Sequence, residues 1–535
     1  MSGADLAFVL LSCLAVMATV AWLSYRSARG EVDTADGYFL AGRNLGGLFI
    51  AGSLLLTNLS AEQLIGLNGS AYGHDMSSMA WEVTAAISTI AMAMIFLPRY
   101  LKGAFTTLPE FLAERFDADV RRWSVILFML GYGLVTIPSV LYSGSLAVIK
   151  IFDVPALLGL SEFGGLVATI WVIGGVGALY AVLGGMKAVA VSDTINGLGL
   201  LLIGGLVLGL GLHALGAGDM GGGIRRLLTD HPEKLNAIGD AQAPTPFGTL
   251  FTGMIIANLF YWCTNQYVIQ RTLAARSLAE GQKGVLLSGF FKILVPLFMM
   301  IPGVIAYHLY GPGLATIDLA FPTLVQDLLP IWLMGAFLAV LLGAVFSSFN
   351  SLLNSAATLF VLDVWMPTRK TPPSQTRIVR VAMIVGAVIA VFSFAVAPML
   401  SRAPEGLWQI IRIFTGFYNI PIVTIVLAGL FTTRVPAVGA KAVILFHVVA
   451  YGLTRFVFAD IVTLHFLHLY AVLFLIEIGI LAIATWLAPR GNPGKPRDAH
   501  QVDLAPWRYA RPVAMLLVAM VIGIYLLFSP LGIAA

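Results

Sequence analysis

Charge is the scarcest feature of this 535-residue chain, because only 11% of its residues are Asp, Glu, Lys or Arg. Soluble domains carry about 25% charged residues, whereas 59% of the residues here are hydrophobic. The scarcity excludes an ordinary soluble protein and predicts a polytopic protein of the lipid bilayer. The net charge of +4 comes from basic residues scattered between hydrophobic segments. We therefore expect no nucleic-acid partner, which would need a clustered basic face.

Cysteine and histidine are scarce as well. Cys13 and Cys263 both lie inside apolar segments, so a disulfide framework is not expected. The eight histidines are dispersed without the spacing of metal ligands, and no soluble catalytic or signalling domain is apparent. An enzyme is therefore not expected, and a membrane sensor built on a transporter-like domain is the weaker alternative to a transporter.

Long hydrophobic runs are abundant. A helix that crosses a bilayer needs about 20 mostly apolar residues. The first such run, from about Ala4 to Leu23, lacks a signal-peptide cleavage site and is expected to be retained as a helix. We expect an all-α membrane protein with about fourteen transmembrane helices, at 5–25, 46–72, 78–101, 122–150, 162–184, 191–215, 247–270, 285–310, 330–364, 378–400, 405–430, 436–455, 463–487 and 511–531.

The distribution of Lys and Arg predicts the orientation of these helices. With an even number of spans, most of the 31 basic residues fall in loops on one side of the membrane. Because cytoplasmic loops carry the excess of Lys and Arg, we expect both termini on the periplasmic or extracellular side of a cell membrane, the inner membrane in a bacterium. The longest outside loop, 216–246, is Gly-rich and is expected to be a flexible connector.

Polar residues interrupt two of the predicted spans at mid-depth. Asn58–Leu64 places amides, a hydroxyl and a carboxylate inside one span, and Asn258–Gln266 repeats the pattern in another. Polar groups at this depth are costly unless they face a cavity or a partner. Two interrupted segments in corresponding places of one chain predict a transporter binding site near the bilayer midplane.

Three runs of the sequence resemble the solute:sodium symporter family, and within it the sodium/glucose and sodium/galactose cotransporters. The runs are Tyr38-Phe39-Leu40-Ala41-Gly42-Arg43, Asn58-Leu59-Ser60-Ala61-Glu62-Gln63-Leu64-Ile65-Gly66 and Asn265-Gln266-Tyr267-Val268-Ile269-Gln270-Arg271-Thr272-Leu273-Ala274-Ala275. The last run is long and specific. The resemblance extends from about residue 38 to about residue 430.

The resemblance implies an inverted repeat of two five-helix units, of the leucine-transporter type, with a broken helix at the start of each unit. The units would span 46–215 and 247–430, on either side of the outside loop 216–246. The first helix with its cytoplasmic loop would occupy 1–45, and three further helices 431–535. The implied activity is sodium-coupled import of a sugar by alternating access, carried out by a monomer.

The resemblance also implies a sodium site between two helices. It would use the carbonyls of Leu56, Leu59 and Ala344 with the hydroxyls of Ser347 and Ser348. Small hydroxyls and carbonyls freed at a helix break supply the oxygens that an alkali cation needs inside a bilayer. The alternative is that the serine pair only bonds back to the preceding turn or lets helices pack closely.

A second sodium site is implied by those relatives that bind two ions. It would use Asp193, Ser347, Asn350 and Ser351. Asparagine departs from the usual serine or threonine at its position but still offers a carbonyl oxygen. The alternative for Asp193 is a carboxylate at the positive end of a helix, so coupling to one or two sodium ions stays open.

Sugars present hydroxyl rims and weakly apolar faces, which amides, charges and aromatic rings can match. The substrate-binding residues implied by the resemblance are Asn58, Gln63, Glu82, Asn258, Tyr261, Lys292 and Arg412. The gate residues implied are Leu67, Trp81, Tyr261 and Trp408. Glu82 and Lys292 are alternatively a structural ion pair.

Arg412 is the main departure, because the sugar cotransporters carry a glutamine at this position. Arg412 either neutralises Glu82 or another internal acid, which leaves a neutral hexose as the substrate, or it clamps an acidic sugar such as a uronate together with Lys292. Arginine binds carboxylates in a bidentate manner, which favours the acid. A sodium symporter for another small organic anion is a further alternative. Glu477 lies outside the repeats and is assigned no role.

Overall fold

The computed structural model describes residues 3–28, 34–402, 407–491 and 498–535. This part of the chain is helical apart from its loops and two isolated β-bridges. The α-helices are α1 (Gly3–Ala28), α2 (Ala35–Leu40), α3 (Gly47–Asn58), α4 (Ala61–Gly73), α5 (Ala80–Val83), α6 (Ala85–Ala91), α7 (Leu97–Gly103), α8 (Leu108–Arg115), α9 (Ala118–Gly131), α10 (Ile137–Phe152), α11 (Val154–Leu158), α12 (Glu162–Leu215), α13 (Met220–Thr229), α14 (Gly253–Leu259), α15 (Gln266–Leu273), α16 (Leu278–Met299), α17 (Ile301–Tyr310), α18 (Ala320–Leu328), α19 (Ile331–Thr358), α20 (Gln375–Val396), α21 (Leu407–Phe431), α22 (Ala437–Gly452), α23 (Phe466–Leu487) and α24 (Ala510–Leu527).

The described helices correspond in order to the predicted spans. Eleven helical stretches are long and apolar enough to cross a membrane, and the bent pair α3 and α4 makes a twelfth. Two further apolar segments, Glu162–Ala178 and Gly253–Thr264, are shorter and lie at the predicted spans 162–184 and 247–270. An all-α membrane protein is thereby confirmed.

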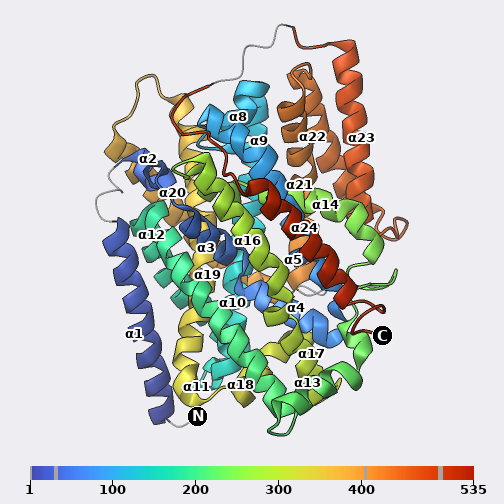
Figure 1. The fold of residues 1–535 in the computed structure, drawn as a ribbon. Helices are drawn as coiled ribbons and strands as arrows, with labels where there is room; N and C mark the ends of the chain where they lie inside the picture. Colours follow the sequence, from blue (N-terminus) through green and yellow to red (C-terminus); the bar gives the residue numbers. More distant parts are fainter. Residues whose placement is uncertain (1–2, 29–33, 403–406, 492–497) are drawn as a thin grey trace.

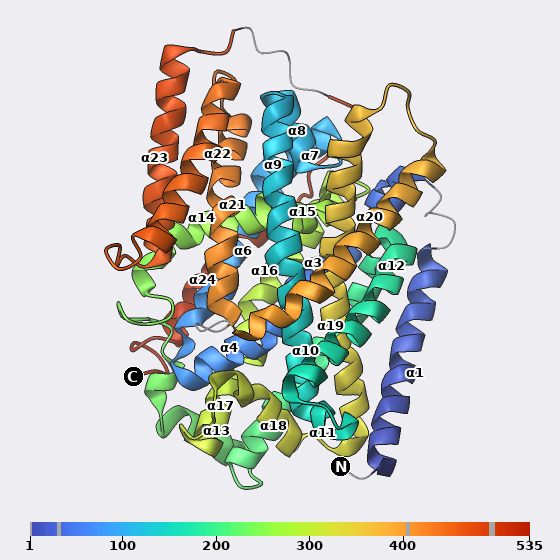
Figure 2. The ribbon, with the colours of Figure 1, turned by 180° about the vertical axis from the view of Figure 1, so that it is seen from behind.

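α12 covers 54 residues in which the sequence predicts two spans. A straight helix of this length would measure roughly 80 Å, far more than the thickness of a bilayer. The flanking helices α11 and α13 both lie at the lower end of the molecule (Figures 1 and 2). The two halves of α12 therefore run in opposite directions, as two separate spans require.

The first broken helix lies where polar residues interrupt the second predicted span. α3 ends at Asn58 and α4 begins at Ala61, with an angle of 59° between them. Ser60 caps α4, because its hydroxyl accepts from the Gln63 amide at 3.4 Å. The Ser60 amide turns back to the Asn58 carbonyl at 2.9 Å. The last carbonyls of α3 therefore lose amide partners that a continuing helix would supply.

The second broken helix is interrupted at Asn265. α14 leads into a π-helical segment, η7 (Phe260–Thr264), and the chain is extended at Asn265 before α15. The hydroxyl of buried Tyr132 donates to Asn265 Oδ1 at 2.6 Å and accepts from the Tyr267 amide at 3.3 Å. One side chain thus satisfies two polar groups at the break, as a buried interruption needs. Both predicted interruptions are present.

The broken helices lie in the interior of the helical bundle. α3 packs against α12, α16 and α19, and α14 packs against α21 and α23. Figures 1 and 2 show α1, α22 and α23 at the periphery. The start of α1 and the end of α24 both lie in the lower half of the molecule in Figure 1.

The loop 216–246, which the sequence predicts on the outside, is folded onto the helices. It forms α13 and a short 3-10 helix, η5 (Pro232–Leu235). Lys234 is buried, and its Nζ donates to the carbonyls of Tyr72 and His74 at 2.9 and 2.8 Å. A cation at the carboxyl end of α4 is favourable, because the last carbonyls of a helix lack amide partners. The loop is thus a structured cap, not the flexible connector that its glycines predict.

Candidate functional site

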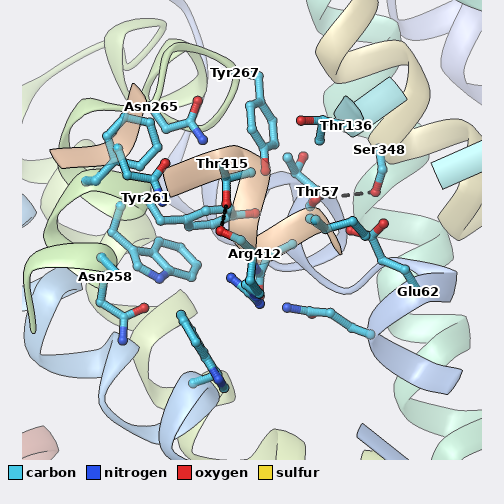
Figure 3. A pocket seen from close by; sticks show the side chains of 18 of the residues that line it. Thr57, Glu62, Thr136, Asn258, Tyr261, Asn265, Tyr267, Ser348, Arg412 and Thr415 are labelled. Atoms are coloured by element: carbon cyan, nitrogen blue, oxygen red, sulfur yellow. Dashed lines mark hydrogen bonds between the residues drawn. The ribbon is translucent and has the colours of Figure 1, made fainter. Parts of the chain in front are cut away.

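A polar cavity lies between the two helix breaks. Figure 3 shows Asn258 and Tyr261 on one side of Arg412, with Thr57, Ser348 and Glu62 on the other. Every predicted substrate-binding residue except Lys292 lines this cavity, namely Asn58, Gln63, Glu82, Asn258, Tyr261 and Arg412. The cavity therefore gathers residues that are up to about 350 positions apart in the sequence.

Lys292 lies beside the cavity, on α16. Its Nζ donates to Glu82 Oε2 and to Asn58 Oδ1, and Gln63 Nε2 donates to the other Glu82 oxygen at 3.1 Å. The side chains of Lys292 and Glu82 are each 1% exposed. The ion pair therefore ties α16 to α5 and to both halves of the first broken helix, while Glu82, Asn58 and Gln63 reach the cavity.

Asn258 and Tyr261 come from the segment before the second break. Asn258 Nδ2 donates to the Thr84 hydroxyl at 2.8 Å. The Tyr261 ring lies edge-on to Tyr267, with ring centres 5.8 Å apart, and the Tyr261 hydroxyl interacts with Asn58 of α3. Tyr261 thus links the two broken helices, which is a suitable place for a gate.

Arg412 enters the cavity from α21. Its guanidinium carbon lies 3.9 Å from the centre of the Trp81 ring, which is a cation–π contact. Glu62 and Glu82 line the same cavity as Arg412, and Lys292 pairs with Glu82. Two acidic and two basic side chains therefore act on one cavity.

The residues of the predicted sodium site meet where α19 passes the first break. The Ser348 hydroxyl donates to the Thr57 carbonyl at 3.3 Å (Figure 3). This contact brings the serine pair to the last turn of α3, where carbonyls are freed by the end of the helix. The five predicted site residues are all buried: Leu56, Leu59, Ala344, Ser347 and Ser348. At this contact one hydroxyl of α19 thus faces one main-chain oxygen of the break, and both are ligand types that suit an alkali cation.

The residues of the predicted second sodium site lie around a buried arginine. Arg271 on α15 is 0% exposed, and its Nε donates to the Ser53 hydroxyl at 3.0 Å. The Ser53 hydroxyl donates to Asp193 Oδ2 at 2.6 Å, and another guanidinium nitrogen donates to Ser351. A fixed positive charge therefore lies among the oxygens that the sequence assigns to a second ion.

The structure describes the predicted gate residues unequally. Trp81 and Tyr261 line the cavity, and Trp81 also stacks on Phe466 of α23 with ring centres 6.5 Å apart. Leu67 is buried on α4 and is not among the described residues that line the cavity. The side chain of Trp408 lies outside the described part of the chain.

Several cavity residues are missed by the sequence analysis: Glu62, Thr136, Asn265, Tyr267 and Thr415. Glu62 was detectable, because it is a carboxylate in the polar stretch that marks the first break. Thr415 lies almost one helical turn after Arg412, so its place at the cavity could have been predicted from the role given to that arginine. Thr136 ends a π-helical segment, η4 (Tyr132–Thr136), and nothing in its sequence context distinguishes it.

The chain is similar to proteins of one transporter family. The model of the "Sodium:solute symporter family" matches residues 38–446. The chain is 42% identical over 514 residues to the "Uncharacterized symporter YidK" of Escherichia coli (strain K12), over 95% of this chain and 88% of that protein. It is 31% identical to the sodium/glucose cotransporter of Vibrio parahaemolyticus, over 78% of this chain and 79% of that protein. It is 30% identical to the sodium/myo-inositol cotransporter 2 of Sus scrofa, over 82% and 67% respectively.

Two solved structures have a similar fold. The structure of a Na+-coupled sialic acid symporter in a substrate-bound outward-open state aligns with a TM-score of 0.77 and 21% identity, over 90% of this chain and 99% of that one. The structure of Mhp1, a nucleobase-cation-symport-1 family transporter, aligns with a TM-score of 0.57 and 13% identity, over 89% and 100% respectively. These likenesses support the fold of two broken helices within a helical bundle.

Proposed function

The chain belongs to the sodium:solute symporter family, and we propose that it imports a neutral sugar or sugar alcohol together with one sodium ion by alternating access. It is a sodium-coupled membrane transporter and not an enzyme. The sugar, the single ion and the direction of transport belong to the proposal. The observation that carries the choice of a neutral substrate is the charge balance of the central cavity.

Each basic side chain at the cavity already has an acidic counterpart. Lys292 pairs with Glu82, and Glu62 lines the cavity together with Arg412, so the formal charges of these four side chains sum to zero. A uronate would bring a third carboxylate into a buried space, where an unbalanced charge is costly. A neutral polyol adds hydroxyls without adding charge, and the amides of Asn58 and Gln63 suit such hydroxyls. Relatives that carry glucose or myo-inositol support the same substrate class.

Uptake of radiolabelled D-galactose into proteoliposomes tests this proposal. With an inward sodium gradient and an inside-negative potential, we expect accumulation that choline abolishes. One inward charge gains about 2.3 kcal/mol per 100 mV, which corresponds to roughly 50-fold accumulation. Unlabelled galactose and myo-inositol should compete, whereas galacturonate should not. Absence of galactose accumulation, with sodium-driven uptake of radiolabelled galacturonate that is lost in Arg412→Gln, would establish the acidic-sugar alternative instead.

Sodium binding would order the first break for the substrate. A cation held by the carbonyls at the end of α3 and the hydroxyls of α19 would fix Asn58, which also faces the sugar. Sodium then raises the affinity for sugar, and sugar raises the affinity for sodium by the same factor. Closure of the outer side and movement of Tyr261 would release both solutes inside.

Replacing Ser348 with alanine should weaken sodium binding selectively. The variant loses one oxygen ligand of the proposed site, and an interaction with a charged group is worth about 1.5–3 kcal/mol. We expect the sodium concentration for half-maximal uptake to rise roughly 10- to 100-fold, with the maximal rate largely recovered at saturating sodium. Ser355→Ala is the matched control, because Ser355 is also buried on α19 but donates to Gln270 at 2.6 Å. Equal sodium requirements in the two variants would remove the proposed site.

We further infer that the protein works as a monomer in the bacterial inner membrane, with both termini on the periplasmic side. The distribution of Lys and Arg between the loops supports this orientation. Labelling of cysteines introduced at the exposed residues 4 and 535 with a membrane-impermeant reagent on intact spheroplasts tests it. Protection of both residues would reverse the assignment.

A further inference from the structure

A second buried polar cluster lies outside the cavity, where α21, α22 and α23 meet. His447 of α22 and Glu477 of α23 are each 0% exposed, with His447 Nδ1 2.6 Å from Glu477 Oε1. The opposite ring nitrogen of His447 lies 2.9 Å from the Gly416 carbonyl of α21. The Thr424 hydroxyl, also on α21, lies 2.5 Å from Glu477 Oε2. Two side chains of the C-terminal helices thus hold α21 at two points.

The contacts of this cluster require a shared proton. His447 Nε2 must carry a hydrogen to bond the Gly416 carbonyl, which only accepts. A neutral imidazole has only one hydrogen on its two ring nitrogens. Nδ1 would then turn a lone pair toward a carboxylate oxygen at 2.6 Å. One added proton between His447 and Glu477 removes this repulsion, either as an imidazolium with a carboxylate or as an imidazole with a carboxylic acid. In both forms the pair is neutral overall, as its burial demands.

The cluster continues through aromatic side chains to Arg412. The ring of Tyr451 stacks on His447 with ring centres 5.5 Å apart, and Tyr470 lies 5.9 Å from Tyr451. The Tyr470 hydroxyl donates to the main-chain carbonyl of Arg412 at 2.9 Å. A Cβ atom on Gly416 would lie only 2.4 Å from the Tyr451 hydroxyl and 2.7 Å from the Tyr470 hydroxyl, so α21 approaches these tyrosines as closely as a glycine allows.

We propose that the protonated His447–Glu477 pair, with Tyr470, is a positioning network that fixes the place of Arg412 in the substrate cavity. Arg412 lies about one helical turn before Gly416, so a shift of the α21 carbonyls would move its guanidinium relative to Trp81 and Glu62. Besides the pair itself, the titratable or charged groups at the cluster are Tyr451, Tyr470, Arg412 and Arg455. The helices α22 and α23 would thereby contribute to sugar recognition without lining the cavity.

Removing the pair as a unit should weaken sugar binding but not sodium binding. This expectation rests on the proposed function, since it uses galactose as the probe. In His447→Leu/Glu477→Leu, two apolar side chains replace the neutral pair. Proteins often tolerate such a replacement of a whole buried pair without loss of stability. We expect the KM for galactose to rise about tenfold, because small displacements of a binding group are costly, with the half-saturating sodium concentration unchanged.

Two single variants separate positioning from mere packing. Glu477→Gln keeps the hydrogen bonds, because its amide can donate to a neutral His447 and its carbonyl can accept from Thr424, so the KM should stay at the wild-type value. Gly416→Ala keeps the pair but pushes α21 away from Tyr470, so the KM should rise as in the double variant. A wild-type KM in the double variant, or an equal rise in both KM and sodium requirement, would overturn the proposal.

A second measurement is independent of transport. Cys13 and Cys263 are both buried, so a cysteine at Thr415 can be labelled with a maleimide against a low background in purified protein. We expect the double variant and Gly416→Ala to change the labelling rate of Thr415→Cys, and Glu477→Gln to leave it unchanged. If galactose is not transported but these rates behave as expected, the proposed function fails and the positioning network stands. Unchanged rates in all variants would refute the network itself.

Discussion

Replacing Lys292 with methionine is expected to reduce sodium-driven galactose uptake at least about 100-fold, because breaking a buried ion pair costs about 3–5 kcal/mol. The substitution removes the cation that donates to Glu82 and Asn58 in a place where both partners are buried. Gln63 would remain as a donor to Glu82, but an amide does not balance a carboxylate. Uptake in proteoliposomes and the melting temperature of the purified variant measure the effect.

Two companion variants show whether charge balance is the cause. Lys283→Met lies on the same helix, but Lys283 is 43% exposed and its partner Glu280 keeps a second cation, Arg276 at 3.6 Å, so uptake should hardly change. Lys292→Met/Glu82→Gln removes both charges, so its melting temperature should return toward the wild-type value while galactose uptake stays low. A double variant as unstable as Lys292→Met alone would contradict the role given to the ion pair.

The breaks in the helices are predictable because their causes are local. Ser60 is a helix N-cap within an apolar run, and Asn58 and Gln63 on either side are amides that lipid cannot satisfy. The interruption at Asn265 is likewise marked by a polar stretch. The capping role of the loop 216–246 is not predictable, because the carbonyls that Lys234 binds belong to Tyr72 and His74, about 160 residues earlier.

The chemistry of the site is predictable in its members but not in its pairings. The sequence identifies Lys292, Glu82 and Arg412 as charges at membrane depth, yet leaves open which carboxylate serves which cation. The answer depends on how α4, α5, α16 and α21 pack together, because only this packing brings Glu62 near Arg412. Glu477 is the clearest failure, because an isolated acid on an apolar helix gives no sign of its partner His447 on the helix before.

Replacing Arg271 with glutamine is expected to make the stability of the protein depend strongly on sodium. We propose that the Arg271 guanidinium serves as a resident cation where the resemblance implies a second sodium ion, so that one sodium suffices for transport. The wild-type protein should then show a Hill coefficient near one for sodium, unchanged in Asn350→Ala. In Arg271→Gln the buried Asp193 loses its cation, a loss of about 3–5 kcal/mol in a medium without sodium.

Sodium should restore the stability of the Arg271→Gln variant, because the oxygens around the lost guanidinium suit an alkali cation. Ser53 and Ser351 lose their donor, and in the described part of the chain Asp193 Oδ1 and both polar atoms of the Asn350 side chain have no hydrogen-bond partner. Thermal unfolding in sodium and in choline measures the effect. Arg271→Gln/Asp193→Asn removes both charges, so its response to sodium should equal that of the wild-type protein.

Arg121→Gln is the control for loss of an arginine that balances a buried carboxylate. Arg121 pairs with Asp363 at 2.6 Å near the predicted cytoplasmic side, and the side chains of Arg121 and Asp363 are 22% and 0% exposed. The described partners of the Arg121 guanidinium are Asp363 and the Leu362 carbonyl at 3.0 Å, so fewer oxygens surround the lost cation than at Arg271. This variant should lose stability equally in sodium and in choline. If sodium rescues both variants to the same extent, the rescue is a nonspecific effect of sodium, and Arg271 does not occupy an ion site.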